Sequence, residues 1–211
     1  MPERAELPQD AQNLQAAAEE KNGFLPNVLA AWAIRPDHLV KWRAHLDALM
    51  QGESKLTRAQ REMIAVAVSG INRCEYCATT HPAFLRLALI EEGRDPLLAH
   101  AIAANPYHAV YNEELSGVER AIIAFALKVT THSSEISPQD VELLRALGLD
   151  DETIFDVAEV AATGVEGERA GQEERETREP YRGIRRTIGQ QMENSKFTAP
   201  HVSHHDTAEV E

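Results

Sequence analysis

The stretch REMIAVAVSGINRCEYCATTHPAFLRL, residues 61–87, decides the fold of this chain and holds its most reactive side chains. Its residues 63–68, MIAVAV, would be apolar nearly all round a helix, which is typical of a buried helix. Residues 69–72, SGIN, offer a break, and Cys74 and Cys77 follow as the two cysteines of the sequence. The stretch therefore predicts a buried helix followed by a second helix that begins with a C-x-x-C pair.

The spacing of the two cysteines and His81 is typical of a thiol redox site. On a helix, Cys74 and Cys77 are three residues apart and Cys77 and His81 are four apart, so all three share one face. A cysteine near a helix N-terminus and beside a histidine is enriched in the reactive thiolate. A thiolate that attacks an oxidant becomes a sulfenic acid, which the second thiol resolves to a disulfide. The alternative, a pair of inert core cysteines, does not explain this spacing.

Glu62 is the candidate carboxylate of the same site. It lies twelve residues before Cys74, which is about 18 Å along a continuous helix and too far for a hydrogen bond. It reaches the cysteines only if the chain folds back at residues 69–72. A buried carboxylate there would orient His81 or relay its proton. The alternative is a solvated helix start at Arg61 and Glu62, but the adjacent apolar run favours the site.

The rest of the first 163 residues is predicted to be helical. Helix-start signals are the pairs Thr57/Gln60 and Ser116/Glu119 and the residue Asp151, while glycines at 23, 52, 93 and 148 favour helix ends. No stretch shows a convincing alternation of period two. We therefore predict an all-α fold, with helices near residues 8–22, 38–50, 56–68, 74–91, 96–104, 116–130, 138–147 and 151–162.

Composition limits the classes of function. The chain has 211 residues, 43% of them hydrophobic, and a net charge of −13. This acidity disfavours nonspecific binding to nucleic acid or to an anionic membrane. There is no apolar signal segment and no apolar run of about 18 residues, so we expect a cytoplasmic protein without a membrane span. A zinc site needs more ligands than one C-x-x-C pair, and His201, His204 and His205 lie far along the chain, so no metal or cofactor is expected.

The residues at this site match the pattern of a known family. The spacing Glu62-x11-Cys74-x2-Cys77-x3-His81 resembles the signature of the AhpD-like proteins in the carboxymuconolactone decarboxylase superfamily. The segments GFLPNV, LTRAQREMIAVAVSGINRCEYCATTH and LGLDDETIFDVAEVAA resemble the peroxidase-related branch. The resemblance covers roughly residues 10–162. It implies an AhpD-like helical bundle that assembles as a homo-oligomer, a trimer or a hexamer.

The resemblance also implies an activity, the reduction of hydroperoxides through the dithiol without metal or heme. An external dithiol such as dihydrolipoamide would recharge the site. By the same resemblance Cys77 would attack the peroxide, Cys74 would resolve the intermediate, and Glu62 and His81 would form the proton relay. The chain departs from the pattern in having Tyr76 where the best-studied members have a histidine.

Pro82, which directly follows His81, is a second departure from a simple helix. A proline disfavours α geometry in the residue before it and removes a backbone N–H. The sequence therefore predicts a kink that re-aims the His81 imidazole.

The C-terminal part of the chain has a different character. Residues 164–180 are charged and nearly free of large apolar side chains, which predicts a disordered linker. Residues 181–211, with RRTIGQQMENS and TAPH, resemble the opening of the catalytic domain of a 2-oxo acid dehydrogenase acyltransferase (E2). We expect no acyltransferase activity, because the sequence holds no catalytic histidine motif and no lipoyl-lysine domain. The segment either docks on a lipoylated E2, a dithiol donor, or is the remnant of a gene fusion.

The sequence thus favours a thiol-dependent peroxidase with residues 1–163 as its helical domain. One alternative is a general dithiol–disulfide oxidoreductase that acts on a partner protein's disulfide. A lyase of the carboxymuconolactone decarboxylase type is another, although that chemistry needs no cysteine pair. A docking module without catalytic activity, acting through residues 181–211, is the third.

Overall fold

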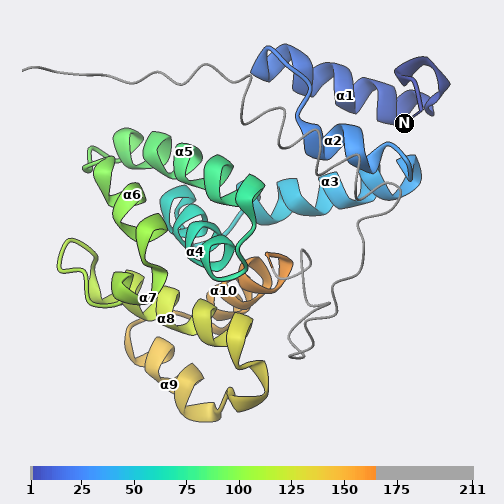
Figure 1. Ribbon diagram of the computed structural model, residues 1–211. Helices are drawn as coiled ribbons and strands as arrows, with labels where there is room; N and C mark the ends of the chain where they lie inside the picture. Colours follow the sequence, from blue (N-terminus) through green and yellow to red (C-terminus); the bar gives the residue numbers. More distant parts are fainter. Residues whose placement is uncertain (1, 165–211) are drawn as a thin grey trace, which may run out of the picture. The chain divides into compact units, whose positions relative to one another are not determined.

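Helices joined by short turns make up residues 2–164, the part of the chain that the computed structural model describes (Figure 1). These residues contain no strand, so the predicted all-α class is confirmed. The helices are α1 (Gln9–Asn22), α2 (Asn27–Trp32), α3 (Pro36–Gln51), α4 (Arg58–Ile71), α5 (Glu75–Glu91), α6 (Leu97–Ala104), α7 (Pro106–Ala109), α8 (Gly117–Thr131), α9 (Pro138–Ala146) and α10 (Asp151–Thr163). Single 3₁₀ turns lie at Arg4–Glu6 and Ser133–Glu135.

Most of the expected helix ends are confirmed. Thr57 and Gln60 form the predicted capping box of α4, in which each side chain accepts a hydrogen bond from the other residue's backbone N–H. The prediction for α10 is wrong by one residue. Its cap is Asp150 rather than Asp151, since Asp150 Oδ1 accepts from the Thr153 N–H at 3.0 Å. The predicted set of helices also lacks α2 and α7, the latter a single turn that follows Asn105.

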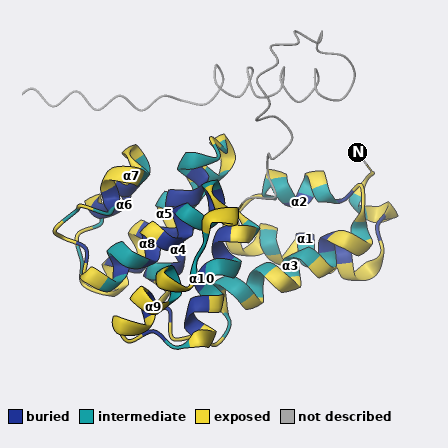
Figure 2. Ribbon diagram, turned by 90° about the horizontal axis from the view of Figure 1, so that it is seen from below, coloured by how far each residue is buried: buried dark blue, intermediate teal, exposed yellow. Residues whose placement is uncertain are grey.

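Helix α4 is the centre of the fold (Figure 1), and it contacts α5, α6, α8 and α10. Its residues Met63 and Val66 belong to the apolar cluster shared with α5, α6 and α8. Ile64 and Val68 belong to a second cluster, with α8, α9 and α10. All six residues of the MIAVAV run are buried, as predicted (Figure 2). A helix apolar all round is stable here because other helices cover it on several sides.

Helices α1, α2 and α3 form a third apolar cluster, and α3 connects it to the rest through contacts with α4 and α10. Arg61 fixes the start of α4 against the end of α3. Its guanidinium donates to the carbonyl oxygens of Leu49 at 3.2 Å and Gly52 at 2.7 Å. A cation near the C-terminus of a helix is favourable because the last carbonyl groups carry partial negative charge. Arg61 is therefore a buried structural residue and not the solvated helix start weighed above.

No helix within residues 2–164 has the length and apolar character that a membrane crossing requires. The predicted linker, residues 164–180, and the acyltransferase-like segment, residues 181–211, lie outside the described residues except for Gly164. The described residues are therefore those of the predicted helical domain. In this domain the ends of α4 and α10 lie at the start of α5.

Candidate dithiol site at the junction of α4 and α5

The chain reverses direction between α4 and α5, as the break at residues 69–72 predicts, although α4 continues to Ile71. Arg73 takes the left-handed backbone conformation, with φ of +52°, which few residues other than glycine adopt. The Asn72 side-chain amide donates to the Gly164 carbonyl oxygen at 2.7 Å. The turn is thereby tied to the end of α10, and α5 begins immediately after it.

Cys74 and Cys77 form a disulfide at the N-terminus of α5. Cys74 is the N-cap residue, and its sulfur accepts a hydrogen bond from the Cys77 backbone N–H at 3.4 Å. Both cysteines are half-buried, so a small molecule or a thiol in solution has access to them. The first N–H groups of a helix carry partial positive charge and stabilise a negative charge placed there. The Cys74 sulfur therefore occupies a position that favours the thiolate once the disulfide is reduced.

Glu62 and His81 meet across this reversal. Glu62 Oε2 lies 2.8 Å from His81 Nδ1, although the residues are nineteen positions apart in the sequence. The Glu62 side chain is 8% exposed and that of His81 is 25% exposed. The predicted fold-back is therefore confirmed, and Glu62 is buried as the site interpretation requires.

The Glu62 contact has a consequence for the second nitrogen of His81. An ionised carboxylate only accepts hydrogen bonds, so His81 Nδ1 is the donor to Glu62. Nε2 is then the ring nitrogen that this contact leaves available. Glu62 thus fixes both the orientation of the ring and the nitrogen that is available.

The expectation for Pro82 is wrong in one respect, because α5 stays helical through His81 and Pro82 to Glu91. The hydroxyl groups of Thr79 and Thr80 both donate to the Tyr76 carbonyl oxygen at 2.8 Å, adding side-chain bonds to the turn before the proline. The His81 ring turns toward Glu62. Within residues 2–164 no hydrogen bond joins His81 to either sulfur in this oxidised state.

Sequence reasoning missed two contacts of the site. One is the Asn72 bond to Gly164, since nothing in the local sequence places α10 beside the turn. The other is Phe84, whose ring packs edge-on against the His81 ring, with centroids 6.4 Å apart. The spacing of three residues between His81 and Phe84 on a helix was a signal that would have found the second contact.

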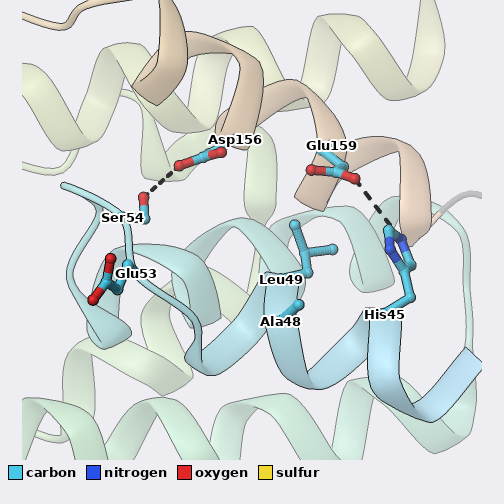
Figure 3. Close-up of a pocket in the computed structure, with 7 residues that line it drawn as sticks. All are labelled: His45, Ala48, Leu49, Glu53, Ser54, Asp156 and Glu159. Carbon is cyan, nitrogen blue, oxygen red and sulfur yellow. Dashed lines mark hydrogen bonds and ion pairs between the residues drawn. The ribbon is translucent and has the colours of Figure 1, made fainter.

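A hollow among the described residues lies away from this site (Figure 3). It is a cavity of about 130 Å³ between α3, the α3–α4 turn and α10. Its polar contacts are the Ser54 hydroxyl to Asp156 at 2.5 Å and the His45–Glu159 ion pair at 3.9 Å. None of the four predicted site residues lines it; the lining residues are His45, Ala48, Leu49, Glu53, Ser54, Asp156 and Glu159.

Within residues 2–164, no three histidine, cysteine, aspartate or glutamate side chains are grouped so that they would hold a metal ion. The groups of the candidate site are two sulfurs, an imidazole and a carboxylate.

Fold and site together define an all-helical protein that carries a dithiol–disulfide pair beside a buried carboxylate–imidazole pair. The model of the carboxymuconolactone decarboxylase family matches residues 36–93, which include all four predicted site residues. No protein of curated function matches the chain.

Two solved structures are similar over most of the chain. One is the alkylhydroperoxidase AhpD core, a peroxidase-related protein from Ralstonia eutropha JMP134. It is 39% identical with a TM-score of 0.70, over 77% of this chain and 82% of that chain. The other is a peroxidase-related protein from Silicibacter sp. TM1040, 37% identical with a TM-score of 0.68, over 76% of this chain and 80% of that chain. The chain therefore belongs to the AhpD-like proteins of the carboxymuconolactone decarboxylase superfamily.

Proposed function

We propose that this protein is a thiol-dependent peroxidase that reduces alkyl hydroperoxides through a cycle of the Cys74–Cys77 dithiol and disulfide. The observation that carries the proposal is the Cys74–Cys77 disulfide on the same helix as His81, whose ring Glu62 holds at 2.8 Å. Similarity to a solved alkylhydroperoxidase AhpD core supports the same reaction class.

The first step oxidises the Cys77 thiolate. Its sulfur attacks the terminal oxygen of R–O–OH, the O–O bond breaks, and a sulfenic acid and an alkoxide form. His81 Nε2 takes the proton that Cys77 gives up when its thiolate forms, and it then passes this proton to the alkoxide, which leaves as the alcohol. Two electrons have passed from sulfur to the peroxide. His81 is suited to this role because it lies one helical turn after Cys77 on α5.

The second step closes the disulfide. The Cys74 thiol gives up its proton, its thiolate attacks the sulfenic sulfur of Cys77, and the hydroxyl group takes up a proton and leaves as water. The N-cap position of Cys74 favours this attack, because α5 stabilises the thiolate of Cys74. The product is the disulfide that the structure contains.

An external dithiol then recharges the site. One of its thiolates attacks the Cys74–Cys77 disulfide to give a mixed disulfide, and its second thiol displaces the protein thiol. The donor ends as a disulfide and the protein regains both thiols. We propose dihydrolipoamide or a related vicinal dithiol as the donor, because a dithiol completes the exchange within one molecule.

Peroxide consumption with dihydrolipoamide tests the proposal in the wild type, Cys74→Ser and Cys77→Ser. We expect turnover in the wild type and its loss in both variants. Cys77→Ser should not react with peroxide at all. Cys74→Ser should form a sulfenic acid that a dimedone probe traps and that does not turn over. Unchanged turnover in both variants would show that the dithiol is not the reacting group.

The donor is proposed to be the lipoyl group of a 2-oxo acid dehydrogenase acyltransferase, because residues 181–211 resemble part of one. The test compares the full chain with a chain that ends at residue 164, using a lipoylated acyltransferase and free dihydrolipoamide. If residues 181–211 dock on the acyltransferase, the full chain should be recharged faster by the lipoylated acyltransferase than by free dihydrolipoamide. The shorter chain should show no such difference. Equal rates for the two chains, together with failure to co-purify, would leave the free dithiol as the donor.

We propose as well that the protein is a homo-oligomer, a trimer or a hexamer. Exposed apolar side chains on the described part of a single chain support this proposal, among them Ile90, Leu97 and Tyr111. Light scattering on the purified full chain gives the mass, and a monomer at micromolar concentration would contradict the proposal.

A general dithiol–disulfide oxidoreductase is the second candidate, favoured by the exposure of Tyr76 between the two half-buried cysteines. A protein disulfide has access to such a site. Fast exchange with an aromatic disulfide probe, combined with no consumption of peroxide, would decide for this candidate.

A further inference from the structure

Phe84 lies at the surface directly beside the candidate site. Phe84 is one of the exposed large apolar residues in the described part of the chain, with 40% of its surface accessible. Its ring meets the His81 ring edge-on, at 78° and 6.4 Å between centroids. Cys77, His81 and Phe84 follow one another on α5 at spacings of four and three residues, so they share one face of the helix.

Glu62 and Phe84 both lie beside the His81 ring. Glu62 approaches the imidazole from α4 and is almost fully buried, so the protein closes that side. A quarter of the His81 side chain is exposed, and Phe84, its aromatic neighbour on α5, is exposed as well. A molecule that brings an oxygen to Cys77 and to the free His81 nitrogen is therefore expected to meet Phe84, because the three residues share one face of α5.

An exposed phenyl ring keeps apolar area in water, and covering that area with an apolar ligand is favourable. The ring stands nearly perpendicular to the His81 ring, and this pairing favours one orientation of the phenyl ring. Ligand sites commonly combine such an apolar wall with a few convergent polar groups, which here are the sulfur and the imidazole. The first turn of α5 holds a second exposed aromatic ring, that of Tyr76.

We propose that Phe84 is the residue that determines specificity for the organic part of the hydroperoxide, and that it favours bulky aromatic groups over small ones. The organic group rests on the phenyl ring while the O–O bond lies at Cys77. The kinetic part of this proposal rests on the proposed peroxidase function. The new element is that a residue outside the dithiol and the relay recognises the substrate.

The test compares kcat/KM for cumene hydroperoxide and for hydrogen peroxide in the wild type and Phe84→Ala. Phe84→Ala removes the aromatic pairing and the apolar contact. The ratio of kcat/KM for cumene hydroperoxide to that for hydrogen peroxide should therefore fall roughly tenfold, while kcat/KM for hydrogen peroxide stays within about threefold of the wild type. Leu87→Ala is the matched control, since Leu87 is 52% exposed on the same helix and lies one turn beyond the site. It should leave the preference unchanged.

A second measurement needs no turnover. Binding of 2-phenyl-2-propanol, the alcohol that cumene hydroperoxide yields, is followed by ligand-observed NMR with the oxidised protein. We expect binding to the wild type and to Leu87→Ala, and its loss in Phe84→Ala. If the wild type consumes neither peroxide but this pattern holds, the proposed peroxidase function fails and the apolar site stands.

Three results would overturn the inference. One is an equal fall for both peroxides, which would make Phe84 a support for the His81 ring only. Another is an unchanged preference together with unchanged binding of the alcohol. The third is a change of oligomeric mass in Phe84→Ala without a change of preference, which would place the ring in an interface between copies of the chain.

Discussion

Glu62→Gln separates the carboxylate's charge from its shape. The amide keeps the volume of the side chain and an oxygen that accepts a hydrogen bond. It removes the negative charge that lies 2.8 Å from His81 Nδ1. In the proposed cycle Glu62 is a positioning residue, which acts on the peroxide only by holding His81 in the correct tautomer and stabilising its charged form.

The magnitude follows from the kind of hydrogen bond and its burial. Bonds to charged groups contribute about 1.5–3 kcal/mol, and about 1.4 kcal/mol corresponds to a tenfold change in rate. Solvent screens this pair little, since the Glu62 side chain is 8% exposed and that of His81 is 25% exposed. We therefore expect kcat/KM for peroxide to fall by about 10- to 150-fold in Glu62→Gln.

The assay is peroxide consumption with saturating dihydrolipoamide across a range of pH, with thermal unfolding followed in the same buffers. Glu75→Gln is the control, because Glu75 is an exposed carboxylate in the first turn of α5 and does not contact His81. Loss of an exposed charge should change kcat/KM by less than about fivefold. Glu62→Gln should also change the shape of the pH profile, which a purely structural residue would not.

One outcome would contradict this role of Glu62. If Glu62→Gln keeps the wild-type rate within about fivefold and the wild-type pH profile, while Cys77→Ser is inactive, then Glu62 does not act through His81. Its burial beside the imidazole would then serve the packing of α4 against α5 alone.

Two further predictions concern stability. Gly164→Ala should lower the free energy of unfolding by about 1–2 kcal/mol, because an added Cβ would lie 2.7 Å from Val68 Cγ1. Gly117→Ala is the control, since open space surrounds Gly117 and the free energy of unfolding should not fall. Urea unfolding measures both variants. Stability should also fall on acidification. Lys128 and then Ser137 lower the pKa of Asp140 from 3.8 to about 2. Burial raises the pKa of Glu119, but hydrogen bonds from Arg94 and Ser116 outweigh it and leave the value lowered. Carboxylates with lowered pKa values stabilise the fold above their unfolded values and lose this contribution as the pH falls through the folded ones. The urea midpoint should therefore drop between about pH 4.5 and 2, and a midpoint that stays level there would contradict the assignment.

The helices were predictable because their signals are local. A capping box depends on residues three apart, and Thr57 with Gln60 is one that the structure contains. The MIAVAV run likewise predicted a helix covered on several sides, and the structure buries all six residues. The cap of α10 was missed by one residue because Asp150 and Asp151 are equally suited in sequence, and only the backbone angles decide between them.

The site was predictable in part, for a related reason. The C-x-x-C spacing and His81 lie on one helix, so their common face follows from periodicity. Glu62 needed a chain reversal, and the SGIN break provided the signal for it. The Asn72 bond to Gly164 depends on where α10 returns to the fold. No local pattern contains that information, because it arises from packing between segments far apart in the sequence.

Helix α4 links the stability of the protein to its chemistry. A buried carboxylate is costly unless it is hydrogen-bonded, and Glu62 is held on the helix that forms the centre of two apolar clusters. The His81 imidazole offsets this cost, and in doing so its ring is fixed against a rigid element. Phe84 lies beside the imidazole, and a quarter of the His81 side chain is exposed. In the proposed cycle, Glu62 thus holds the ring for the proton relay while the exposed part of His81 leaves access for a substrate. Helix α5 carries both His81 and Phe84 because it stays continuous through Pro82.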